Sequence, residues 1–314
     1  MSVIRVLPER DMWLPGETVL GTVELHVDKP LRARGVRVRL RGYEETRVTH
    51  GSGKSRHTHR EHRDLLDWEE TFVGEDRISD ALEGFSDAVR ALFGGGEYLR
   101  IPVGKRRFDF QVTLPDGCQV SYEGEHAKVV YELLAYVDVP AGLDVRDERT
   151  LYVLAPPVGE PGRRPCVGDY PGANDHWGVF EGLRAALAPD IRMRVQLASE
   201  AFLVGEEIRG TLAVWNESGA RIRHVEISLI AQEDATAGHA SARSITAHAR
   251  EELPSPVMRD FSAEFALKIP PNAHPTMAGA FFTYNWGVKV RLDIPWQFDV
   301  VSVLPIGVFA AARD

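Results

Sequence analysis

The chain has 314 residues, of which 44% are hydrophobic, and this supports two domains of ordinary size with real cores. Its 37 lysines and arginines against 46 aspartates and glutamates give a formal charge of −9, which argues against a nucleic-acid-binding protein with a basic face. Two cysteines are too few for a disulfide framework, and the sequence has neither a signal peptide nor an apolar run of about 18 residues. We therefore expect a cytoplasmic protein without a membrane span.

The first part of the chain alternates short apolar segments with turns. Met1 to Leu7 and Thr18 to Val27 have the period-two pattern of strands. Val36 to Arg41 alternates apolar residues with arginines, so the three arginines of that segment share one face of a strand. Thr49 to Arg63 is polar, rich in Gly, Ser and His, and without a period, which predicts a loop. Trp68 to Val73 is a further candidate strand.

One amphipathic helix is predicted. From Ile78 to Phe93, apolar residues recur every three or four positions and so fall on one helix face. Three glycines, Gly94 to Gly96, follow it and favour a helix end, because glycine adopts the left-handed conformation without steric cost. The polar side of the helix is mainly acidic, which favours packing on a sheet over lying on a membrane surface.

Strand patterns then resume over Phe108 to Leu114, Val129 to Val139 and Arg149 to Leu154. Residues 156–189 are dense in proline and glycine and predict an interdomain linker. Ile191 opens a second region of alternating apolar residues.

The chain contains an internal duplication. Leu14 to Thr46 and Leu203 to Ala235 are identical at ten of 33 positions at an offset of 189 residues, and apolar substitutions fall in phase. Phe110 to Pro115 and Phe265 to Pro270 match at an offset of 155. The difference, 189 − 155 = 34, is an insertion in the first copy, where the histidine-rich segment and the helix fall.

About seven or more short strands separated by turns in each copy are typical of a β-sandwich. The sequence therefore predicts an all-β protein with two tandem immunoglobulin-like sandwiches and one helix on the first. The predicted domains are 1–155, a linker over 156–189, and 190–310.

Two segments resemble a known family. The pattern of Pro15 to Leu25, followed by Val36 to Gly42, is similar to the arrestin N-domain, and Tyr122 to Pro140 is similar to arrestin-domain proteins of the alpha type. The chain also resembles prokaryotic branches of this fold, such as sporulation-control proteins, and retromer cargo-adaptor subunits. The resemblance covers roughly residues 1–155 and 190–308.

This resemblance implies a cytosolic adaptor or scaffold without catalysis, which binds protein partners, membrane-protein tails among them, on sheet faces, edges and loops. Regulated arrestins hold their domains through a buried network of Asp and Arg. Asp28 matches one acidic position of that network, and Arg149 lies nearest to the arginine position. The lysine pair on the first strand of phosphate-sensing members is represented only by Arg5, which counts against a phosphate-triggered switch.

The basic residues around the third candidate strand form a second candidate site. Arginine forks suit phosphate and carboxylate groups, so these residues are candidates for binding an anionic partner. The alternative is a solvated strand face whose arginines pair with acids on a neighbouring strand. The candidates are Arg32, Arg34, Arg37, Arg39 and Arg41.

Closely spaced histidines, His57, His59 and His62 with His50, resemble a set of metal ligands. Interleaved arginines and the absence of a metal-ligand motif favour a solvated segment instead, so neither a metal nor a cofactor is expected. Glu123, Glu125 and His126 include acid and base groups, but no nucleophile motif accompanies them, and we expect no enzymatic activity.

Two alternatives to the adaptor remain. One is a self-associating structural or regulatory protein of the sporulation or stress type, which would form homo-oligomers through exposed sheet edges. The other is a small-ligand or metal-binding module that uses the histidine-rich residues 50–62.

Overall fold

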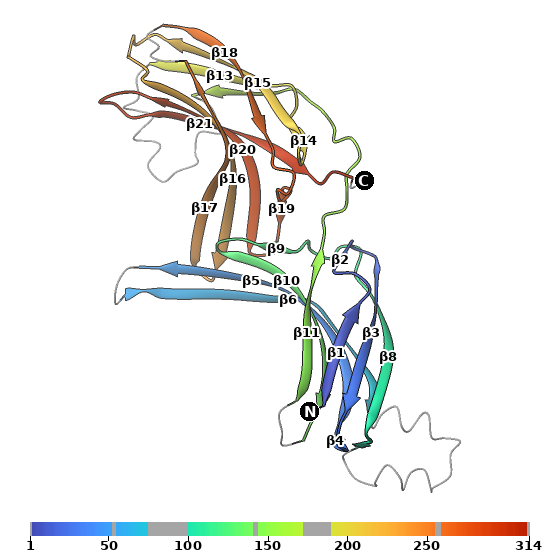
Figure 1. Cartoon of the computed structure of the whole chain (residues 1–314). Helices are drawn as coiled ribbons and strands as arrows, with labels where there is room; N and C mark the ends of the chain where they lie inside the picture. The colour runs from blue at the N-terminus through green and yellow to red at the C-terminus, as the bar shows by residue number, and fades with distance from the viewer. Residues whose placement is uncertain are drawn as a thin grey trace. The chain divides into compact units, whose positions relative to one another are not determined.

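The computed structural model describes residues 2–51, 55–74, 99–140, 144–171, 190–254 and 259–312, and the regular elements formed there are all β-strands (Figure 1). The expected all-β fold is therefore confirmed. The chain divides into two compact units: unit 1 comprises Met1–Thr46 and Arg60–Ala155, and unit 2 comprises Arg47–His59 and Pro156–Asp314. The predicted helix, Ile78 to Phe93, lies outside the described residues.

Unit 1 contains a three-stranded sheet of order β1–β3–β8 and most of a six-stranded sheet of order β2–β11–β10–β5–β6, in which β9 pairs with β10, while β4 and β7 form a separate ribbon. Residues 47–50 of β5 and 57–59 of β6 are assigned to unit 2. The strands are β1 (Val3–Pro8), β2 (Met12–Trp13), β3 (Thr18–Val27), β4 (Leu31–Ala33), β5 (Gly35–His50), β6 (His57–Gly74), β7 (Leu99–Ile101), β8 (Gly104–Thr113), β9 (Tyr122–Glu123), β10 (Ala127–Asp138) and β11 (Val145–Val153).

Unit 2 contains a four-stranded sheet of order β12–β13–β15–β18 and a six-stranded sheet of order β14–β21–β20–β16–β17, in which β19 pairs with β20. The strands are β12 (Cys166–Tyr170), β13 (Ile191–Leu197), β14 (Ala201–Leu203), β15 (Glu207–Asn216), β16 (His224–Ala237), β17 (Ala240–Leu253), β18 (Phe261–Lys268), β19 (Met277–Ala278), β20 (Phe282–Asp293) and β21 (Val300–Phe309).

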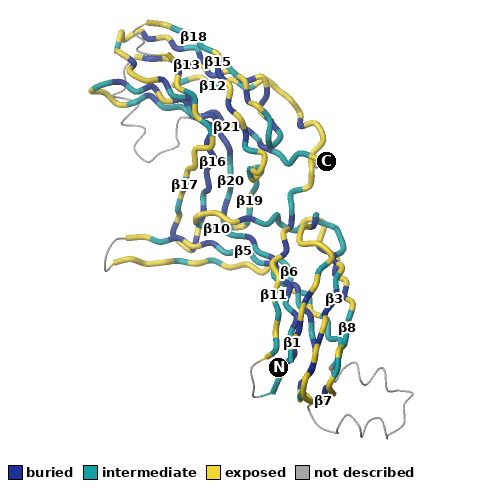
Figure 2. The backbone as a smooth tube through the Cα atoms, viewed as in Figure 1, coloured by how far each residue is buried: buried dark blue, intermediate teal, exposed yellow. Residues whose placement is uncertain are grey.

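The core of each unit follows from the alternating pattern of its strands. In β5, Val36, Val38 and Leu40 are fully buried, and the residues between them face outward. Leu40 lies opposite Leu133 of β10, which is also fully buried. Figure 2 shows this alternation of buried and more exposed positions along the strands. The inward rows exclude water, and burial of this apolar surface is the main term that stabilises each unit.

The duplication is visible in individual contacts. The Glu17 carboxylate accepts the Leu14 N–H at 2.6 Å, and the equivalent Glu206 accepts the Leu203 N–H at 2.8 Å. The Tyr131 hydroxyl donates to a main-chain carbonyl at 2.7 Å, and the indole N–H of Trp286, 155 residues later, does the same at 2.9 Å. Different side chains therefore fill one structural role in the two copies.

An ion pair is also repeated. Arg34 approaches Asp138 at 3.3 Å in unit 1, and the equivalent Arg223 approaches Asp293 at 2.8 Å in unit 2. In both copies the main-chain N–H of the arginine also donates to the main-chain carbonyl of the same aspartate, at 2.8 Å each time. The pair holds the start of one long strand against the end of its neighbour.

The structure differs from the expected loop over Thr49 to Arg63. β5 continues to His50, and β6 starts at His57, so most of the described part of this segment is a hairpin. The Thr49 and Thr58 hydroxyls lie 3.0 Å apart across it. The expectation was wrong because these strand ends carry polar side chains on both faces, which removes the apolar alternation used to recognise strands.

Part of the predicted linker is also a strand. β12 pairs antiparallel with β13 and joins the four-stranded sheet of unit 2. Before it, the Val158 N–H donates to the Ala310 carbonyl at 3.0 Å, and the Arg164 carbonyl accepts the Glu200 N–H at 2.8 Å. Residues 158–170 are thus held against unit 2 by main-chain hydrogen bonds.

Candidate protein-binding surface

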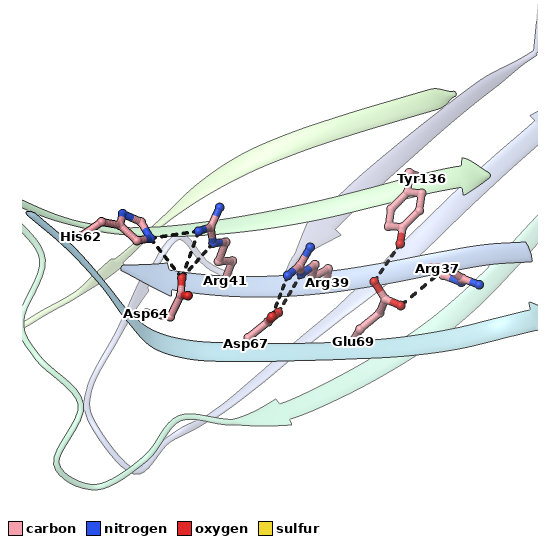
Figure 3. A network of polar contacts seen from close by, with 8 residues as sticks. All are labelled: Arg37, Arg39, Arg41, His62, Asp64, Asp67, Glu69 and Tyr136. Carbon is pink, nitrogen blue, oxygen red and sulfur yellow. Dashed lines mark hydrogen bonds and ion pairs between the residues drawn. The ribbon is translucent and has the colours of Figure 1, made fainter. Parts of the chain in front are cut away.

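Three of the five predicted arginines stand in a row on the outward face of β5. Because β5 lies between β10 and β6, this row is flanked by the side chains of both neighbours. We define the arginine face as this row with the polar residues that it contacts: Arg37, Arg39, Arg41, His62, Asp64, Asp67, Glu69 and Tyr136 (Figure 3).

The strongest contact on the arginine face joins Arg39 of β5 to Asp67 of β6. The Nε and Nη2 atoms of Arg39 donate to the two carboxylate oxygens of Asp67 at 2.7 and 2.6 Å, which is the two-pronged geometry that arginine favours. The hydrogen bond from Arg39 is the main cause that lowers the pKa of Asp67. This carboxylate therefore stays ionised at neutral pH and keeps the guanidinium in one orientation.

A second contact joins three side chains at the next outward position. Arg41 donates to Asp64 from Nε at 3.3 Å and from Nη2 at 3.0 Å. The Nε2 atom of His62 lies 3.0 Å from Arg41 and 3.2 Å from Asp64. The hydrogen bond from Arg41, followed by that from His62, lowers the pKa of Asp64.

Arg37 is held less closely. Its Nη1 atom lies 3.8 Å from a Glu69 oxygen and 4.0 Å from an Asp138 oxygen. The Tyr136 hydroxyl donates to Glu69 at 2.7 Å and so competes for that carboxylate. The Nε atom of Arg37 is buried without a hydrogen-bond partner.

The remaining two arginines lie elsewhere. Arg34 precedes β5 and faces Asp138, which Arg37 also approaches. Arg32 is on β4, opposite Arg100 of β7, and is not part of the arginine face. The structure therefore brings together Arg37, Arg39 and Arg41, with Arg34 beside one end, and separates Arg32 from them.

The structure does not bring Asp28 and Arg149 together. Asp28 follows β3 and lies 2.8 Å from His26, whereas Arg149 on β11 lies 4.0 Å from Asp147. Asp147 also accepts the Val6 N–H of β1 at 2.9 Å. The described contacts of Arg149 therefore place it beside Asp147 and not beside Asp28.

The histidines occupy different surroundings on β5 and β6. His62 belongs to the arginine face, and the rings of His50 and His59 have centroids 6.1 Å apart. Within the described ranges, no group of three or more His, Cys, Asp or Glu side chains is placed to hold a metal ion. His57 is exposed at the start of the strand.

The predicted acid–base set lies at the β9–β10 turn. Glu123 ends β9, and the His126 ring lies 3.9 Å from the Glu125 carboxylate, which is largely exposed. The Gly124 N–H donates to the Ala127 carbonyl at 2.8 Å, which closes the turn. Glu125 and His126 thus form a loose surface pair at a hairpin turn.

The sequence indicates acidic residues on a neighbouring strand but does not identify which ones. Asp64, Asp67 and Glu69 are the partners that the arginines find on β6. A signal for them exists in the acid-rich segment after the histidines, but their pairing depends on β5 and β6 being neighbours. Tyr136 lies on β10 opposite Arg37 of β5, about a hundred residues away in the chain. No local sequence pattern therefore predicts that it belongs to the arginine face.

Comparisons with known proteins agree with the duplicated architecture. The family profile described as "Arrestin (or S-antigen), N-terminal domain" matches residues 4–157, and the one described as "Arrestin (or S-antigen), C-terminal domain" matches residues 190–312. None of the described residues forms a helix with the length and apolarity needed to cross a membrane.

Curated relatives match about half of the chain. Arrestin domain-containing protein 1 of Mus musculus is 27% identical over 156 residues, which cover 49% of this chain and 29% of that protein. The protein of the same name from Rattus norvegicus is 27% identical over 154 residues, with the same shares. The match spans less than a third of each relative. Because the two halves match the two arrestin domains in order, the chain belongs to the arrestin family.

Proposed function

We propose that this chain is a non-enzymatic cytoplasmic adaptor or scaffold that binds protein partners, with the cytoplasmic tails of membrane proteins as the expected class. Membership of the arrestin family supports this function. The structural observation that carries the proposal is the arginine face, where three arginines and Tyr136 stand on adjacent strands of one sheet.

The side chains of the arginine face are accessible and already oriented. Those of Arg37, Arg39 and Arg41 are 31%, 39% and 40% exposed. Arginine and tyrosine dominate the residues that carry binding energy at protein interfaces. Ion pairs to β6 hold these arginine side chains on the outward face of β5 while no partner is bound.

The charges of the face indicate how a partner binds. The three arginines are matched by Asp64, Asp67 and Glu69, so the face does not attract anions through net charge. A partner must instead exchange its own carboxylates for those of β6. Alternate residues of a strand lie about 7 Å apart, so an extended segment with acidic residues at every second position matches the spacing of the arginines.

The first experiment is a crosslinked pull-down from the native cytosol with mass spectrometry, run beside light scattering on the purified protein. The adaptor proposal expects the bait to retain a distinct protein. Capture of the chain alone, with no distinct protein retained, would overturn the proposal, whatever oligomeric state scattering reports.

Variants then test the arginine face. Arg39→Asp removes the guanidinium and breaks the ion pair, and the double variant Arg39→Asp/Asp67→Arg restores the pair with its charges exchanged. Arg194→Asp is the matched control, because Arg194 makes an equivalent two-pronged contact with Asp169 in unit 2, at 2.6 and 3.1 Å. We expect both Arg39 variants to lose the captured partner and the control to keep it. Recovery of binding in the double variant would show that Arg39 acts only through folding.

A further inference from the structure

β18 is the last of the described strands in the four-stranded sheet of unit 2. Its outward N–H groups are therefore not paired by the sheet. One of them, that of Ala266, donates to the Glu251 carboxylate of β17 at 2.9 Å. β17 lies near this edge, and its Glu251 side chain occupies one position of it, in the way that natural sheets limit edge-to-edge pairing.

Two opposite charges flank Ala266 on this edge. Glu264 and Lys268 are exposed, lie on the same outward face of β18, and form no ion pair with another described residue. Each is two residues from Ala266. An antiparallel strand of the same sequence centred on Ala266 therefore places Glu264 opposite Lys268, and Lys268 opposite Glu264.

We propose that β18 pairs with β18 of a second copy of this chain, antiparallel about Ala266. The Ala266 N–H of each copy then donates to the Ala266 carbonyl of the other, in place of Glu251. Opposite charges directly across an antiparallel pair stabilise it, and the two-fold arrangement forms this contact twice. The two four-stranded sheets become one continuous sheet.

A hollow beside the edge fits this register. It has a volume of about 730 Å³ and is lined in part by Glu251, Glu264, Thr211 and Arg209. Arg209 forms an ion pair with Glu207 at 2.7 Å. The charged groups of the hollow that remain for a partner are therefore the carboxylates of Glu251 and Glu264. Lys268 of the second copy lies opposite Glu264 in the proposed pair, so its ammonium group enters the hollow toward Glu264 and the released Glu251.

Unit 1 provides an internal comparison. A hollow of about 540 Å³ occurs at the equivalent position beside β8, lined in part by Thr22, Asp109 and Gln111. The residue equivalent to Lys268, 155 positions earlier, is Thr113, so pairing of β8 about Gln111 would place Asp109 opposite an uncharged threonine. The hollow is common to both copies, whereas the self-complementary charges belong to β18 alone. This difference selects unit 2 as the dimer surface.

The test measures the oligomeric state of the full-length chain by sedimentation velocity over a wide concentration range. The pairing spans only about five residues per strand, so we expect a weak, reversible dimer of the wild-type chain. Lys268→Glu and Glu264→Lys each place like charges opposite each other twice, and each raises the dimer Kd by about tenfold or more.

A mixture of the two single variants tests the proposed register directly. In an equimolar mixture of Lys268→Glu and Glu264→Lys, the heterodimer has only opposite charges across the pair, so the mixture recovers the dimer that each variant alone has lost. The double variant Glu264→Lys/Lys268→Glu recovers it as well. Circular dichroism confirms that every variant is folded, and Asp109→Lys on β8 is the matched control that leaves the dimer unchanged.

A monomeric wild-type chain at the highest concentration overturns the proposal, and so does a dimer that the single reversals leave intact. Failure of the mixture to dimerise, when both single variants are folded, also overturns it. Capture of a different protein through β18, with no self-association, would assign the edge to another extended segment.

Discussion

Glu17 shows how a single carboxylate fixes a turn. It accepts the Leu14 N–H and pairs with Arg10 at 2.8 Å, and Glu206 repeats the arrangement with Arg163 at 2.7 Å. Replacement of Glu17 by Ala leaves a main-chain donor without its acceptor, which we expect to cost about 1–2 kcal/mol in the free energy of unfolding. Urea denaturation measures this loss, and an unchanged midpoint with an unchanged slope would contradict it.

The pH dependence of the same residue follows from its contacts. The hydrogen bond from Leu14, and then that from Arg10, lowers the pKa of Glu17 below its usual value. Because the folded-state pKa lies below the unfolded value, the stabilisation is present above the unfolded pKa and is lost as the pH falls through the folded one. The stability difference between wild type and Glu17→Ala should therefore shrink on acidification below about pH 4. A difference that persists at lower pH would point to packing instead of charge.

Gly21 and Gly210 are duplicated residues with a steric role. A Cβ atom on Gly21 would lie 2.5 Å from Phe110 Cζ and 2.8 Å from the Leu7 carbonyl oxygen, and one on Gly210 would meet Phe265 and the Gln196 carbonyl at 2.6 and 2.8 Å. Gly21→Ala and Gly210→Ala should each cost about 2–3 kcal/mol, because the carbonyl belongs to a neighbouring strand and cannot move freely. Gly117→Ala is the control, since no atom lies within 4 Å of its Cβ position. Thermal unfolding of the three variants should separate the first two from the control.

At the scale of elements, the pairing of β5 with β6 determines which carboxylates form ion pairs with the arginines of β5. Arg39 and Asp67 are 39% and 51% exposed, so solvent screens their attraction. A double-mutant cycle with Arg39→Ala and Asp67→Ala should give a coupling of about 0.5 kcal/mol that decreases in high salt. A coupling of several kcal/mol would mean that the pair stabilises the sheet strongly and would weaken its assignment as an exchangeable binding surface.

At the scale of the whole molecule, residues 158–170 belong with unit 2. β12, the Val158–Ala310 hydrogen bond and the Arg163–Glu206 ion pair all connect them to that unit. A fragment of residues 156–314 should therefore melt at a clearly higher temperature than a fragment of residues 190–314, because the shorter one exposes the edge of β13 and loses these contacts. Circular dichroism melts of both fragments test this. Equal melting temperatures would show that residues 156–189 only connect the two units.

The sequence by itself determined the all-β class, the duplication and the family, because alternating apolar residues and repeated turn motifs are local signals that survive in each copy. It also predicted that Arg37, Arg39 and Arg41 share a face, since that follows from the two-residue period of a strand. Only the tertiary structure decided which acids they contact, because Asp64, Asp67 and Glu69 of β6 reach them through the order of strands in the sheet. It also separated Asp28 from Arg149 and left the outer edge of β18 without a paired strand in its sheet, since strand neighbours are set by pairing between segments distant in the chain, and no local pattern encodes them.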